Sequence, residues 1–197
     1  MKNTLFWIAG AVLALSIAAL AAWGSLRKSA PPPGDGFAAQ IDLKTLEALA
    51  VHNEGRLNSF ESFARFTLKY VSGPHRVNNQ PAVFTYMDMM VRPEAYEEAD
   101  AVWIKNKTMR QDLAKAVVQS GARDAAWGEA FMKTGLIAPA LLERPEIQAM
   151  IDVWARDLIK TAKFVDDIRG ALHIRSPELL SRQLRLIPPP PGPEDRE

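Results

Sequence analysis

Three histidines carry the imidazole groups that a metal site or a general base would need. His52, His75 and His173 are far apart in the sequence, and none of them has a second histidine at the i, i+4 spacing of a helical metal pair. The chain has no cysteine, which excludes disulfides, thiolate ligands and the C-x-x-C-H attachment of c-type haem. A haem- or metal-binding module built from His52, His75, the methionines and Arg56 is kept as an alternative hypothesis.

The methionine-rich run at residues 86–90, YMDMM, offers thioether sulfur, which is a soft ligand for copper or an axial ligand for haem. Methionine is also an adaptable filler of hydrophobic cores. Met87 and Met90 fall on the apolar face of a predicted helix, so we interpret the run as core packing. The same interpretation holds for the large aromatic residues at helical positions, Trp103, Trp127 and Trp154.

Sequence motifs of common catalytic sites are missing. The chain contains no G-x-S-x-G, Walker loop, G-x-G-x-x-G or H-E-x-x-H. An acidic cluster at Glu97, Glu98 and Asp100 has no basic neighbour in the sequence, and we predict a solvated loop there. We therefore predict a non-enzyme without catalytic, cofactor-binding or metal-ligating residues.

The net charge bears on nucleic-acid binding, and the chain length bears on the number of domains. The 24 Lys and Arg residues nearly balance the 23 Asp and Glu residues, so the chain lacks the basic field that attracts nucleic acid, and we expect no nucleic-acid partner. A chain of 197 residues is long enough for one domain with a hydrophobic core, and it is short for two domains that each have their own core.

The N-terminus carries the strongest compositional signal. Residues 5–23, LFWIAGAVLALSIAALAAW, contain no charge and are long enough as a helix to span a hydrocarbon core of about 30 Å. Trp7 and Trp23 suit the two interfaces, and Arg27 and Lys28 follow the apolar run. We predict a single-pass anchor in residues 1–28. The alternative is a cleaved signal peptide, because the A-L-A at residues 19–21 resembles a processing site.

Proline and glycine set the limits of the folded part. Residues 29–36, SAPPPGDG, predict a short linker, and the proline-rich tail at residues 188–197 predicts an extended end. Between them, residues 37–187 show mostly helical periodicity and no convincing alternation of β-branched residues. We expect a mainly α, compact multi-helix domain, with helices at residues 43–51, 59–71, 81–90, 108–118, 124–133 and 145–170 and a last one starting at Ser176.

The segment GRLNSFESFARF, residues 55–66, combines a glycine turn with a helix start. Gly55 permits the turn, Asn58 or Ser59 can cap the helix, and Glu61 suits the positive end of the helix dipole. The guanidinium groups of Arg56 and Arg65 are candidates for holding this turn by bonds to carboxylates or carbonyls. Gly55, Arg56, Glu61 and Arg65 are thus predicted as structural or interaction residues.

This segment also resembles a known family. Gly55-Arg56 and Ala64-Arg65 match the ends of a pattern found in the extramembrane domain associated with CcsA/ResC-type (system II) cytochrome c biogenesis proteins, with phenylalanines in the hydrophobic places. The Lys, Pro, Asp and Thr positions of that pattern hold Asn, Ser, Glu and Ser here. Weaker similarity follows in order at residues 89–96, 103–106 and 184–188 and at Arg110.

The resemblance implies a place in cytochrome assembly. The membrane helices, Trp-rich haem segment and histidine ligands of that family lie beyond this chain, so a lone copy implies no haem attachment of its own. We therefore expect a non-catalytic assembly factor or accessory subunit of a cytochrome-containing electron-transfer complex, respiratory or photosynthetic. Its expected place is the bacterial inner membrane, in contact with the lipid bilayer, with the domain on the periplasmic side.

Overall fold

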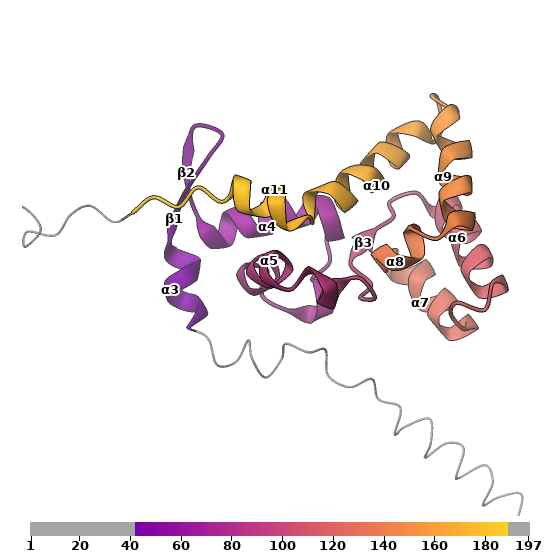
Figure 1. The fold of residues 1–197 in the computed structure, drawn as a ribbon, viewed down its shortest axis with the longest axis horizontal. Coiled ribbons are helices and arrows are strands. Elements are labelled where there is room, and N and C mark those ends of the chain that lie inside the picture. Colours follow the sequence, from indigo (N-terminus) through magenta and orange to yellow (C-terminus); the bar gives the residue numbers. More distant parts are fainter. Residues whose placement is uncertain (1–41, 189–197) are drawn as a thin grey trace, which may run out of the picture. The chain divides into compact units, whose positions relative to one another are not determined.

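The computed structural model describes residues 42–188, and the predicted anchor, linker and nearly all of the predicted tail lie outside this range. The described part is mainly helical, which confirms the predicted mainly α, multi-helix domain (Figure 1). Its helices are α3 (Leu43–Ala48), α4 (Phe60–Ser72), η1 (Val77–Asn79), α5 (Ala82–Val91), η2 (Pro93–Tyr96), α6 (Lys107–Gln119), α7 (Ala125–Thr134), α8 (Pro139–Leu142), α9 (Pro145–Arg156), α10 (Ala162–Ile174) and α11 (Pro177–Gln183). Its strands are β1 (Ala50–Asn53), β2 (Arg56–Ser59), β3 (Val102–Trp103) and β4 (Leu136–Ile137).

Two hydrophobic clusters form the core. One lies among the hairpin, α4, α5 and α11, with Phe60, Phe63 and Tyr86 at its centre. The other lies among β3, α6, α7, β4, α8, α9 and α10. Helix α10 belongs to the second cluster and also packs against α4, so it ties the two together (Figure 1).

Several predicted helix ends are confirmed. Ser59 caps α4 by accepting a 3.2 Å hydrogen bond from the Ser62 amide, and Gly73 ends this helix with a φ of 62°. Asp124 caps α7 and left-handed Gly135 ends it, and Ser176 caps α11. The helix expected at residues 108–118 begins one residue earlier as α6, because the Asn106 side chain caps it by accepting from the amides of Thr108 and Met109.

The predicted single helix over residues 145–170 is wrong. It is broken into α9 and α10 because two polar side chains bond the backbone in place of the helical ladder. Asp157 Oδ1 accepts from the amides of Ile159 and Lys160, and the Thr161 hydroxyl donates to the Trp154 carbonyl at 2.6 Å. The apolar period runs on through Leu158, but this side chain is exposed.

The prediction without strands also missed a hairpin. The predicted helix over residues 43–51 ends at Ala48, and β1 pairs antiparallel with β2 in the register Val51 to Asn58. Glu54 and Gly55 make the connecting turn with φ values of 49° and 76°, the positive-φ pair typical of a tight two-residue hairpin. Each strand is only four residues long, too short for a period-2 pattern to be seen in the sequence.

Candidate functional site: a groove with a basic rim

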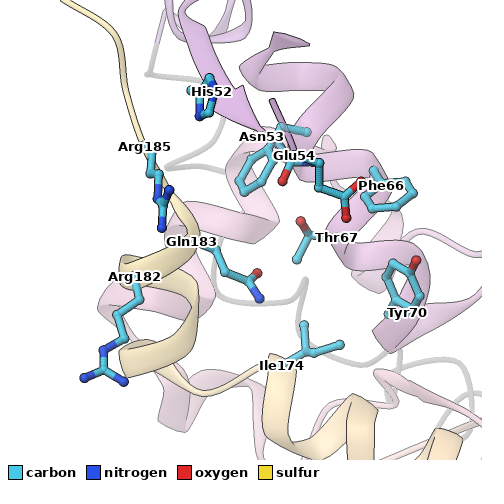
Figure 2. A pocket seen from close by; sticks show the side chains of 11 residues that line it. His52, Asn53, Glu54, Phe66, Thr67, Tyr70, Ile174, Arg182, Gln183 and Arg185 are labelled. Atoms are coloured by element: carbon cyan, nitrogen blue, oxygen red, sulfur yellow. The ribbon is translucent and has the colours of Figure 1, made fainter. Parts of the chain in front are cut away.

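A groove of about 510 Å³ opens between α4, the hairpin and the C-terminal segment (Figure 2). We call it the basic groove. Phe63 and Thr67 of α4 are buried and form part of its lining. The full lining is His52, Asn53, Glu54, Phe63, Phe66, Thr67, Tyr70, Ile174, Arg182, Gln183 and Arg185.

Backbone pairing sets the position of the groove's basic side. After α11 the chain runs beside β1, where the His52 amide donates to the Arg185 carbonyl at 2.9 Å and the Ile187 amide donates to the Ala50 carbonyl at 2.9 Å. This pairing brings Arg185 next to His52, although they are far apart in the sequence. The Tyr86 hydroxyl holds α11 against α5 by donating a hydrogen bond to the Leu180 carbonyl at 2.6 Å.

The two walls differ in chemistry. Figure 2 shows His52, Arg185 and Arg182 along one side and Glu54, Phe66 and Tyr70 along the other. Phe66 and Tyr70 pack edge to face at 5.2 Å between ring centroids and remain 46% and 58% exposed. Within residues 42–188, neither Arg182 nor Arg185 has a side-chain hydrogen bond or ion pair. Unpaired guanidinium groups beside exposed aromatic rings suit a carboxylate-bearing, partly apolar ligand.

The predicted marker residues occupy other places. Gly55 forms the hairpin turn, and Glu61 lies in the first turn of α4, where it pairs with Arg65. Arg56 is exposed at the start of β2 and has no side-chain bond within the described range. Ser59 therefore caps the start of α4, and Arg65 bonds the Glu61 carboxylate in its first turn, as the sequence predicted, whereas Arg56 makes no such bond.

The structure does not bring together the histidines of the alternative haem or metal site. His52 lines the basic groove, whereas His75 lines a different cavity of about 610 Å³ and His173 is on the exposed side of α10. Of the YMDMM methionines, Met89 is fully buried, and Met87 and Met90 are partly buried against the same core cluster, so the interpretation of this run as core packing is confirmed. No group of three or more His, Asp or Glu side chains in the described range could hold a metal ion.

Three residues from the other segments that carried the resemblance, Arg92, Tyr96 and Arg110, make structural contacts. Tyr96 donates to Asp88 Oδ2 at 2.8 Å and lies 3.1 Å from Gln80 Oε1, while Arg92 pairs with Asp88. Burial, and then the Asp88 carboxylate, raise the pKa of Tyr96, which keeps its hydroxyl protonated. Arg110 Nε donates to the Ile104 carbonyl at 2.5 Å, and desolvation lowers the pKa of its guanidinium.

The predicted solvated acidic loop is wrong for two of its three residues. Glu97 accepts a bidentate pair of bonds from Arg175 at 2.9 and 3.1 Å. Burial raises the pKa of Asp100, although the Trp127 indole donates to this carboxylate at 3.2 Å. Glu98 is exposed and pairs with Arg123. The three partners, Arg175, Trp127 and Arg123, are distant in the sequence, so a prediction based on neighbouring residues alone could not include them.

Comparisons with known proteins add no relative: no family model, curated protein or solved structure matches this chain. Within the described range no helix is both long and apolar enough to cross a bilayer. The predicted span at residues 5–23 lies outside that range.

Proposed function

We propose that the chain is a non-catalytic, membrane-anchored docking subunit whose basic groove holds an acidic segment of a partner protein. The observation that carries the proposal is one groove with two unpartnered guanidinium groups, Arg182 and Arg185, on one side and two exposed aromatic rings on the other. Side chains of this kind are enriched at the centres of protein interfaces, where they are anchoring residues.

The finer proposal names the partner. The resemblance of residues 55–66 to the extramembrane domain of CcsA/ResC-associated proteins supports a cytochrome-containing membrane complex, respiratory or photosynthetic. The apolar run at residues 5–23 supports a single-pass anchor in the bacterial inner membrane with the domain on the periplasmic side.

Two roles are compatible with this proposal, and a deletion strain separates them. A maturation factor is needed for every c-type cytochrome, so its loss removes all c-type haem staining. A permanent accessory subunit is present in fixed stoichiometry, so its loss destabilises one complex and leaves the other cytochromes in place.

The groove is tested by complementing that strain with Arg182→Glu/Arg185→Glu. We expect this variant to fold and to lose both co-purification with the complex in mild detergent and complementation. Lys105→Glu/Lys107→Glu is the matched control, because it makes the same change in charge at exposed residues outside the groove. Full complementation by the groove variant would contradict the proposal.

A further inference from the structure

The turn between α9 and α10 exposes two adjacent aliphatic side chains almost completely. Leu158 is 83% exposed and Ile159 is 94% exposed, and Val153 on the last turns of α9 is exposed as well. Figure 1 shows this turn at the far end of the α9 and α10 pair. We call Val153, Leu158 and Ile159 the apolar tip. Within the described part it lies on elements other than those that form the basic groove.

The tip is held in place by its own backbone bonds. Asp157 Oδ1 accepts from the Ile159 amide at 3.3 Å and the Lys160 amide at 3.1 Å, and the Thr161 and Ala162 amides both donate to the Asp157 carbonyl. A turn fixed in this way presents its two aliphatic side chains at little further cost in conformational entropy. The exposure of Leu158 and Ile159 therefore follows from the hydrogen-bonded conformation of the turn.

The charges next to the tip in the sequence are mainly positive. Residues 153–163 carry three exposed basic side chains, Arg156, Lys160 and Lys163, and one acidic side chain, Asp157. The acidic neighbours are partly engaged, because Asp157 bonds the turn and Asp152 pairs with Arg169 at 3.0 Å. The next carboxylates, Asp166 and Asp167, follow about one helical turn beyond Lys163 on α10. Aliphatic side chains flanked by Lys and Arg are typical of a surface that enters the headgroup region of an anionic bilayer.

We propose that the apolar tip inserts Leu158 and Ile159 into the interface of an anionic lipid bilayer and so orients the domain on the membrane. This inference rests on the proposed anchor, since a tethered domain is already concentrated at the surface and needs only weak contacts to adopt one orientation. The chain between the predicted span and residue 42 can reach about 60 Å when extended, so the tether does not prevent this contact.

The absence of cysteine allows a direct test on the full chain. Ile159→Cys carries the only thiol and takes an environment-sensitive fluorophore, and Val91→Cys, at another exposed aliphatic residue of the domain, is the matched control. Both labelled chains are reconstituted in vesicles of phosphatidylcholine alone or mixed with phosphatidylglycerol, and flotation reports anchoring independently of the label. Equal thermal midpoints of labelled and unlabelled chains show that the domain is folded.

We expect the label at residue 159 to emit at shorter wavelength and to be quenched by nitroxide lipids, more strongly with phosphatidylglycerol, while the label at residue 91 stays in water. Lys160→Glu/Lys163→Glu should remove the dependence on phosphatidylglycerol. If the chain floats while the label at residue 159 stays in water, the proposed insertion of the apolar tip is contradicted and the proposed anchor is not. If the chain does not float, both the proposed anchor and the proposed insertion of the tip are contradicted. A label shielded only in native membranes assigns the tip to a protein and overturns the lipid proposal.

Discussion

The indole ring of Trp103 occupies the space next to Gly73 so closely that a Cβ on this glycine would lie 2.3 Å from the ring carbon Cδ2. Gly73 ends α4 and Trp103 lies on β3, so this contact joins the end of α4 to β3. The backbone at Gly73 also has a positive φ of 62°. Two independent requirements, conformation and close approach, therefore specify glycine here.

Gly73→Ala should destabilise the domain by about 2–6 kcal/mol, the sum of a backbone cost of about 1–3 kcal/mol at φ 62° and ψ −132° and about 1–3 kcal/mol for displacement of the ring. Gly121→Ala is the matched control, because Gly121 has a φ of 72° but nothing within 4 Å of the added Cβ. Chemical denaturation of both variants measures the difference. Equal losses would show that Trp103 does not constrain Gly73.

Tyr96→Phe should cost about 1–3 kcal/mol, because the carboxylate of Asp88 loses a 2.8 Å hydrogen bond in a buried site. Tyr70→Phe removes the same hydroxyl from an exposed ring and should change stability by less than about 0.5 kcal/mol. Thermal midpoints of the two variants separate the cases. A Tyr96→Phe variant as stable as the wild type would contradict the network.

Arg65→Ala should lower the thermal midpoint, but only by about 1–2 °C. The pair with Glu61 is an i, i+4 ion pair whose arginine side chain is 70% exposed, and such pairs stabilise by about 0.3–0.5 kcal/mol. The Glu61→Gln/Arg65→Ala double variant should lose less than the sum of the two single losses, and high salt should reduce the effect. A loss above about 5 °C would give Arg65 a role beyond this pair.

The burial of Asp100 should make the stability of the domain depend on pH. Burial raises its pKa in the folded state, so the folded protein keeps a proton that the unfolded chain has released. The contribution of Asp100 to stability is therefore greatest below about pH 4, and it falls as pH rises through the folded pKa. The midpoint of Asp100→Asn relative to the wild type should increase over this window. Asp167→Asn, at an exposed residue of α10, controls for the loss of one charge, and identical profiles for the two variants would contradict the burial argument.

The sequence predicted those features that local chemistry decides. Ser59, Asp124 and Ser176 cap their helices through side chains that bond the amide three residues away, and Gly135 ends α7 in the left-handed conformation. The break at Asp157 was missed because the apolar period continues across it, and a period does not report which backbone bonds a side chain replaces.

The candidate site depends on contacts between distant residues, which a local pattern does not show. Arg185 reaches the groove because the C-terminal segment pairs with β1, and nothing in residues 184–188 alone predicts that pairing. Phe66 belongs to the segment at residues 55–66, but its exposure depends on how α4 packs and is not encoded in the local pattern. The arginines chosen from that segment, Arg56 and Arg65, are not in the lining of the groove.

The most direct test of the central claim, that the basic groove docks a partner from a cytochrome-containing membrane complex, is photocrosslinking from residue 70 in native membranes. A photoreactive amino acid replaces Tyr70, and Val91 is the control site because it is exposed and outside the groove. We predict an adduct between residue 70 and one subunit of a haem-containing complex, absent at residue 91 and lost with Arg182→Glu/Arg185→Glu. No adduct at residue 70, or one that persists in the charge-reversed groove, would contradict the account.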